Sequence, residues 1–161
     1  MQNPTASKKR MPFDEYFMRI AILAGERSTC MRRKAGAVLV KGKQIIATGY
    51  NGAPMGAPHC DEKEGCLRQK LKIPSGQRHE ICRASHAEQN AITQAAKFGI
   101  PVEGASTYTI SFPCIICAKL IINAGIKEVV YVEDYGDSES NRLAKELFAE
   151  CGVRVRKLNL G

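Results

Sequence analysis

The chain has 161 residues, of which 44% are hydrophobic and 25% charged, a composition typical of one globular domain with its own core. No apolar run approaches the roughly 20 residues of a membrane span, and the polar start has no apolar stretch like that of a secretory signal. We therefore expect a cytoplasmic protein rather than a membrane-spanning or a secreted one. A formal net charge of +8 suggests an anionic partner, with a solvated basic surface as the alternative.

The chain begins with a polar stretch followed by an amphipathic pattern. Residues 1–11 lack apolar periodicity and are expected to form a mobile arm, which leaves one domain over 12–161. Apolar side chains then recur at three- and four-residue steps, which predicts a helix that ends near Gly25. The predicted buried face of this helix comprises Phe13, Tyr16, Phe17, Ile20 and Ala24.

A predicted hairpin and two irregular stretches follow. Short apolar runs over 35–40 and 44–49 flank Gly42, which predicts two strands and a tight turn. The glycine- and proline-rich stretch 50–58 predicts a shaped loop, which either presents bare amides to an anion or only connects two elements. The polar, cysteine-rich insertion 59–83 has no core pattern, so something else must hold it in place.

The second half of the chain predicts alternating helices and strands. The helices cover 87–98, 113–123 and 140–148, and the strands cover 107–111, 128–132 and 153–158. Strand–helix–strand units with short links imply right-handed crossovers, so these three strands should be parallel. With the hairpin, this predicts the α/β class: a three-layer α/β/α architecture with a five-stranded mixed sheet and helices on both faces.

Two of the predicted helix starts carry the residues of a catalytic zinc site. His86 and Glu88 begin one helix, and Cys114 and Cys117 lie three apart at the start of the next. One imidazole and two thiolates offset the charge of a zinc ion and leave a position for water, whose protons Glu88 could move. Singly, the cysteine pair could be redox-active and the histidine a core residue. In combination, these residues form the signature of zinc deaminases.

These motifs resemble the cytidine deaminase superfamily. They are His86-Ala87-Glu88 and Pro113-Cys114-Ile115-Ile116-Cys117. Three further stretches are similar to deoxycytidylate (dCMP) deaminases, and the resemblance covers residues 13–158. They are Gly49-Tyr50-Asn51-Gly52 with Pro54 and Gly56, the run from His86 to Ile92, and Cys117-Ala118-Lys119 continuing to Ile122-Asn123-Ala124-Gly125-Ile126. The resemblance implies a cytidine-deaminase-like fold.

The resemblance also implies a reaction, the hydrolysis of dCMP to dUMP and ammonia, which would supply dUMP for thymidylate synthesis. Glu88 would be the general acid/base: it takes a proton from zinc-bound water, hydroxide on the metal attacks C4, and protons pass to N3 and the leaving amine. The substrate contacts implied by the resemblance are Asn51, Ala87, Ser111 and Tyr135.

Regulation and assembly are implied in the same way. Some dCMP deaminases are activated by dCTP and inhibited by dTTP, with magnesium, through a glycine-rich loop that here contains Gly52, Pro54 and Gly56. Such enzymes assemble as hexamers, so we expect a homo-oligomer and favour a hexamer.

Five cysteines remain after the catalytic pair is assigned. Four of them would form a closed four-sulfur site suited to structural zinc; they are Cys30, Cys60, Cys66 and Cys82. Some members of this branch carry a second zinc, although a histidine and a glutamate complete its best-known form, so His79 competes with Cys66. The alternative is one zinc and free thiols. Cys151, in the apolar end of a helix, is expected to belong to the core.

Two other functions stay open. One is a deaminase for another substrate, such as cytidine, CMP, a pterin-like base or a tRNA adenosine, which the basic N-terminal region weakly favours. The other is a non-catalytic, zinc-stabilised nucleic-acid-binding protein. The latter would have no need of Glu88 beside the metal.

Overall fold

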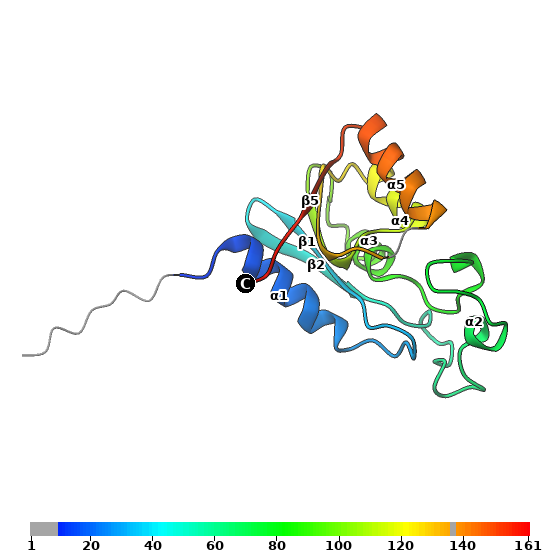
Figure 1. Cartoon of the computed structure of the whole chain (residues 1–161). Coiled ribbons are helices and arrows are strands. Elements are labelled where there is room, and N and C mark those ends of the chain that lie inside the picture. Colours follow the sequence, from blue (N-terminus) through cyan, green and yellow to red (C-terminus); the bar gives the residue numbers. More distant parts are fainter. Residues whose placement is uncertain (1–9, 136–137) are drawn as a thin grey trace, which may run out of the picture.

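The computed structural model describes residues 10–135 and 138–161, so the predicted mobile arm over 1–11 lies almost wholly outside the described residues. The helices are α1 (Phe13–Gly25), α2 (Leu67–Lys70), α3 (Ala87–Lys97), α4 (Ile115–Asn123) and α5 (Glu139–Glu150), with a short 3₁₀ helix, η1 (His79–Ile81) (Figure 1). The strands are β1 (Gly36–Lys41), β2 (Gln44–Tyr50), β3 (Ser106–Ser111), β4 (Glu128–Glu133) and β5 (Arg154–Lys157). No helix in the described part of the chain is long and apolar enough to cross a membrane.

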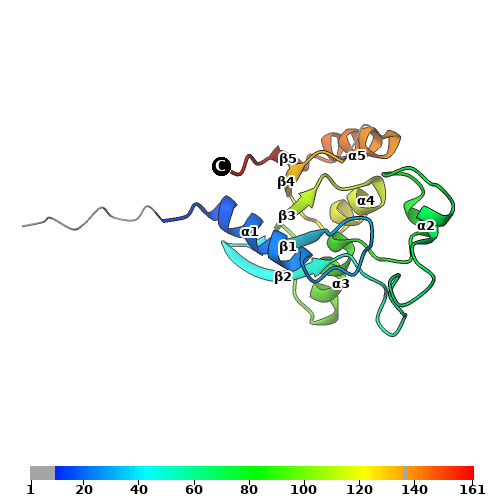
Figure 2. The ribbon, with the colours of Figure 1, turned by 60° about the horizontal axis from the view of Figure 1, so that its bottom comes forward.

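The strands form one mixed sheet in the order β2-β1-β3-β4-β5 (Figure 2). β1 is antiparallel to both of its neighbours, whereas β3, β4 and β5 are parallel. Side chains alternate along β1, so Val38 and Val40 pack under α1, while Ala37 and Leu39 face the core formed with α3, α4 and α5. The predicted α/β class, the mixed sheet and the helices on both faces are confirmed.

The predicted buried face of α1 is wrong in part. Phe17 is buried as expected, but Phe13 and Tyr16 are 50% and 44% exposed. The buried positions are Phe17, Met18, Ala21 and Gly25. The buried face differs from the predicted one because the backbone of α1 lies directly against β1. A Cβ on Gly36 would lie 1.9 Å from the carbonyl oxygen of Ala21. Small residues of α1 must therefore face the strand.

A polar cluster ties the start of α1 to β5 on the same face of the sheet. Arg156 donates hydrogen bonds to both oxygens of Asp14, at 3.0 and 3.2 Å, and one to Glu128 at 2.7 Å. The hydrogen bond from Arg156 is the main reason that the pKa of Asp14 lies below its usual value. Burial raises the pKa of Glu128, but the hydrogen bonds that it accepts, first from Arg156, outweigh burial and lower it.

This cluster should make stability depend on pH. A depressed folded-state pKa means that the stabilisation is complete above the unfolded-state pKa and is lost as the pH falls through the folded-state value. Asp14→Asn should therefore lower the free energy of unfolding by about 1 kcal/mol at pH 7. This value is kept small because the side chains of Asp14 and Arg156 are about one-third exposed. At about pH 3 the same substitution should lower the free energy of unfolding by less. Urea unfolding at both pH values measures this, with Glu146→Gln, which breaks an ion pair within α5, as the control. An equal loss at both values would contradict the ionic origin.

Candidate active site

His86 and Glu88 are positioned by the start of α3. His86 is the N-cap residue, and its backbone N–H donates to the side chain of Gln89 at 2.7 Å, which fixes the first turn. Gly49 lets the helix lie directly against β2, because a Cβ there would be 2.2 Å from the carbonyl oxygen of Ala87. The close contact holds the imidazole and the carboxylate at the end of the sheet where β3 and β4 end.

Cys114 and Cys117 are positioned by the start of α4. The helix begins two residues later than predicted, so Cys114 is its N-cap and Pro113 precedes the cap. Both thiols are buried. β3 ends at Ser111, so the connection from this strand delivers the cysteine pair to the carboxyl end of the parallel strands, where α/β sheets bind ligands.

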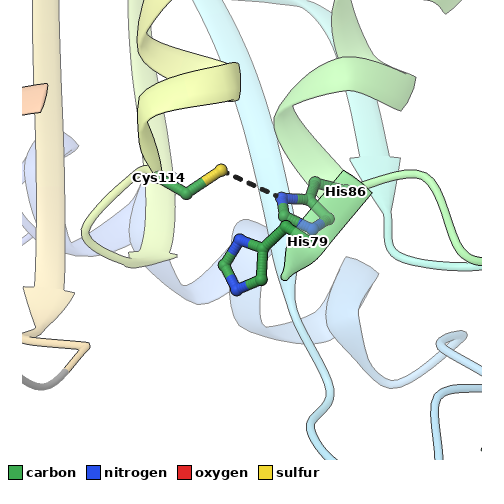
Figure 3. A group of neighbouring side chains, drawn as sticks. All are labelled: His79, His86 and Cys114. Atoms are coloured by element: carbon green, nitrogen blue, oxygen red, sulfur yellow. Dashed lines mark hydrogen bonds between the residues drawn. The ribbon is translucent and has the colours of Figure 1, made fainter. Parts of the chain in front are cut away.

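The three predicted zinc ligands converge. The Nδ1 atom of His86 lies 3.4 Å from the sulfur of Cys114 and 3.3 Å from that of Cys117. Figure 3 shows Cys114 reaching from α4 toward the imidazole. Tetrahedral zinc, with bonds of about 2.0–2.3 Å to nitrogen and sulfur, holds such ligands about 3.5–3.8 Å apart. The imidazole of His86 therefore lies close enough to each sulfur to share a zinc ion with it after small adjustments. The groups whose ligand atoms all lie within 4.8 Å of one another in the described residues combine His86 with Cys114 and His79, and with Cys117 and Glu88.

Glu88 lies beside this cluster and is 7% exposed. Thr109 of β3 donates its hydroxyl to one carboxylate oxygen at 3.2 Å, and the sulfur of Cys117 lies 3.7 Å from the other. Burial raises the pKa of Glu88 above its usual value. A buried carboxyl group with a raised pKa beside these predicted ligands is suited to accept and release protons. Thr109, which orients it, was not predicted from the sequence.

The charges within the cluster favour metal binding. Cys117 and the neighbouring histidines donate toward the sulfur of Cys114 and hold the pKa of that thiol far below its usual value, although burial opposes them. Burial lowers the pKa of His86, and so does the charge of Arg68. The hydrogen bond with Cys114 and the charge of Cys114 outweigh both, so the pKa of His86 is raised. These hydrogen bonds favour the thiolate form of Cys114, whereas the hydrogen bond with Cys114 and burial raise the pKa of the Cys117 thiol.

All four predicted substrate contacts line one cavity of about 90 Å³, together with Glu88 and two of the predicted ligands. They are Asn51, Ala87, Ser111 and Tyr135. Such a volume is well above the ~10–15 Å³ that one water molecule requires, so the cavity has room for part of a ligand. The hydroxyl of Ser111 is buried and has no hydrogen-bond partner among the described residues, which leaves it available to a ligand.

Two of these contacts are held by neighbouring residues. The side chain of Asn51 accepts from the backbone N–H of Ala35 and donates to the carbonyl of Arg33, both at 2.8 Å, so its amide is fixed in orientation. Tyr135 accepts a hydrogen bond from Ser75 at 3.0 Å, and the guanidinium of Arg33 lies 4.6 Å from its ring centre. The loop after β4 is thereby pinned to the insertion.

Comparison with known proteins agrees with this geometry. Residues 11–133 match the family described as the cytidine and deoxycytidylate deaminase zinc-binding region. The chain belongs to this family. ComE operon protein 2 of Bacillus subtilis is 43% identical over 152 residues, which are 94% of this chain and 74% of that protein. The deoxycytidylate deaminase of Schizosaccharomyces pombe is 41% identical over 149 residues, which are 92% of this chain but only 44% of that protein.

Solved structures of the family are similar in fold. The crystal structure of dCMP deaminase from the cyanophage S-TIM5, in complex with dCMP and dUMP, has a TM-score of 0.74 and 31% sequence identity. The match covers 92% of this chain and the whole of that one.

The insertion of this deaminase-family chain folds back onto the metal cluster. The ring of His79, from η1, lies edge-on to that of His86 with the centroids 4.9 Å apart (Figure 3). The ring centroid of Tyr135 lies 6.0 Å from that of His79. His79, His86 and Cys114 bring their ligand atoms within 4.8 Å of one another. His79 thus lies beside the predicted catalytic ligands, and its competition with Cys66 for a second zinc stays a prediction.

The three predicted effector residues of the glycine-rich loop do not line the cavity, although the adjacent Asn51 does. Gly52 pairs with Ser85 through two backbone hydrogen bonds, of 2.9 and 3.2 Å, so its amide is not bare as the sequence suggested. Pro54 and Gly56 are exposed at the surface. None of the three lines the cavity beside Glu88.

The four cysteines of the predicted second site line the same cavity as the catalytic cluster. Burial raises the pKa of Cys60, and the charges of Cys66, Cys82 and Cys30 raise it further. In the described part of the chain two groups bring ligand atoms within 4.8 Å of one another, and these thiols belong to neither.

The core assignment of Cys151 is wrong, because the thiol is exposed. α5 ends at Glu150, and Cys151 caps it where the chain turns at Gly152, which has φ +67°. The residue therefore lies beyond the buried face of the helix, which holds Asn141, Ala144 and Phe148.

Proposed function

We propose that this protein is a zinc-dependent deaminase that hydrolyses dCMP to dUMP and ammonia. The observation that carries the proposal is a buried carboxylate, Glu88, beside convergent imidazole and thiol ligands in a cavity. Membership of the cytidine and deoxycytidylate deaminase family supports the reaction. The likeness to the cyanophage enzyme, whose structure contains dCMP and dUMP, supports the substrate.

His86, Cys114 and Cys117 would hold the zinc ion. When bound there, zinc supplies a nucleophile at neutral pH, because it lowers the pKa of a coordinated water. Glu88 accepts a proton from the attacking water and delivers protons to ring N3 and to the leaving amine. Its burial serves both steps, because a raised pKa makes the carboxylate a better base and keeps the proton available for delivery. Thr109 is a positioning residue that holds one carboxylate oxygen.

The cavity wall orients the nucleotide. The backbone of Ala87 and Ser111 would contact the pyrimidine edge, and the unpartnered hydroxyl of Ser111 offers one more hydrogen bond. Tyr135, held by Ser75 and Arg33, would pack beside the base. The amide of Asn51, fixed by two backbone hydrogen bonds, would contact the sugar part of the nucleotide without reorganising.

A substrate panel tests this proposal. The zinc-loaded chain should deaminate dCMP at least tenfold more efficiently, by kcat/KM, than deoxycytidine or a tRNA stem-loop with an unpaired adenosine. Deoxycytidine lacks the phosphate, the adenosine presents a different base, and one missing contact costs about 1.4 kcal/mol or more. CMP, which differs from dCMP only by an added 2′-hydroxyl, measures the preference for deoxyribose. Turnover of the tRNA stem-loop alone would mean that the substrate is a tRNA adenosine and not dCMP. Binding of nucleic acid with no turnover of any substrate would favour the non-catalytic alternative.

We also propose a second, structural zinc bound by Cys30, Cys60, Cys66 and Cys82. The lining of one cavity by all four thiols supports it, and so does the irregular course of the insertion, which only two short helical segments interrupt. Four-sulfur zinc sites are closed and contribute directly to folding. Side-chain rotations that bring the sulfurs to about 3.8 Å apart would complete the site.

Regulation and assembly stay predictions for this chain. Activation by dCTP and inhibition by dTTP, with magnesium, would act through the exposed loop at Pro54 and Gly56, whereas the Gly52 amide is already paired. We favour a hexamer as the assembly. Light scattering of the purified chain measures the assembly, and the rate of dCMP turnover with and without each nucleotide measures the regulation.

A further inference from the structure

Arg68 is a buried cation without an acidic partner. It comes from α2 in the insertion and is only 5% exposed. Its guanidinium donates one long hydrogen bond, of 3.4 Å, to the carbonyl of Pro74, and its Nε atom has no hydrogen-bond partner in the part of the chain that is described. Since burial of an unpaired charge is unfavourable, such a side chain is stabilised by an anion that binds beside it.

Arg68 faces the catalytic cavity. It lines the same cavity as Glu88 and His86. It does not lie on the outer surface of the insertion, where Arg78 is exposed and paired with Glu80.

A second arginine lies next to it. Arg32, which lines the cavity as well, donates to the carbonyl of Ile73 at 3.3 Å, so the two guanidinium groups contact the carbonyls of consecutive residues. Arg33, the third arginine of the wall, is already paired with Glu133. Glu88, at the metal cluster, is the carboxylate of this wall, so the part near Arg32 and Arg68 carries an excess of positive charge.

We propose that Arg68, with Arg32 beside it, binds the 5′-phosphate of the nucleotide substrate. This inference rests on the proposed function: the phosphate lies at the opposite end of dCMP from the 4-amino group, so a base held at Glu88 directs its phosphate to another part of the wall. The planar fork of arginine matches the oxygens of a phosphate, and a charge-assisted pair in a buried site is strong. The insertion would thereby select nucleoside monophosphates over free nucleosides.

The test compares Arg68→Met with Arg68→Lys and with Arg78→Met, a matched control on the exposed side of the insertion. The ratio of kcat/KM for dCMP to that for deoxycytidine should fall on the order of 100-fold in Arg68→Met. Arg68→Lys should restore part of the ratio, and Arg78→Met should behave as the wild type. An unchanged ratio in Arg68→Met would overturn the proposal.

Thermal unfolding gives a second readout that does not depend on activity. Removal of an unpaired buried charge should leave the melting temperature of ligand-free Arg68→Met equal to or above that of the wild type. Inorganic phosphate should raise the melting temperature of the wild type and of Arg78→Met but not that of Arg68→Met. A lower melting temperature in Arg68→Met, together with equal losses on dCMP and deoxycytidine, would make the role structural and overturn the subsite.

The two readouts also separate this inference from the function on which it rests. A wild-type chain that deaminates dCMP and keeps its phosphate preference without Arg68 overturns the subsite alone. A chain without any turnover, whose melting temperature still rises with phosphate through Arg68, supports the anion site and overturns the deaminase.

Discussion

Replacement of Glu88 by Gln is expected to lower kcat for dCMP by about 10²–10⁴-fold, the usual contribution of a general acid/base. The amide keeps the size and the Thr109 hydrogen bond of the carboxylate but cannot carry the proton from water to N3 and the amine. Zinc content should be unchanged, because Glu88 is not one of the proposed ligands. Steady-state kinetics with metal analysis of the same sample measure both quantities.

Glu150→Gln is the matched control for this variant. Glu150 is an exposed carboxylate at the end of α5, so its replacement should leave both kcat and zinc content as in the wild type. If Glu88→Gln were fully active, the general acid/base assignment would be wrong. If it lost its zinc, Glu88 would be a ligand.

The zinc content of two cysteine variants should distinguish the two proposed sites. The wild type should contain two zinc ions per chain. Cys117→Ser should contain one and lose activity by more than about 10³-fold, because the catalytic ligand set is broken. Cys66→Ser should also contain one, keep the catalytic zinc, and unfold at lower temperature, because the insertion loses its metal.

Cys151→Ser is the control for the cysteine variants, since this exposed thiol is assigned to no site. Elemental analysis after dialysis, with circular dichroism to establish that each variant is folded, gives the comparison. One zinc in the wild type would exclude the second site. Two zinc ions in folded Cys117→Ser would contradict the catalytic ligand assignment.

The sequence predicted those features whose signal is local. The hairpin was predicted from two apolar runs around Gly42, and in the structure Gly42 and Lys43 both adopt the positive φ values of such a turn. The helix starts at His86 and Cys114 were predicted from motif spacing, and their donor atoms meet as that spacing implied. Their roles as ligands await the metal analysis.

What the sequence could not give depends on contacts between distant segments. The face that α1 buries is set by a close backbone approach at Gly36, which periodicity within the helix does not report. His79 and Arg68 belong to an insertion without periodicity, where charged residues are expected to be exposed, yet both line the cavity. Thr109 lies in a strand pattern, and only the packing of α3 on the sheet brings it to Glu88.

The most direct test of the central claim is the product analysis of dCMP incubated with the zinc-loaded wild-type chain and with its Glu88→Gln variant. The wild type should release dUMP and ammonia in equal amounts, with many turnovers per chain. The variant, with the same zinc content, should release both at least about 10²-fold more slowly. A wild-type chain that carries zinc yet converts no dCMP, or equal rates for the two proteins, would contradict the claim.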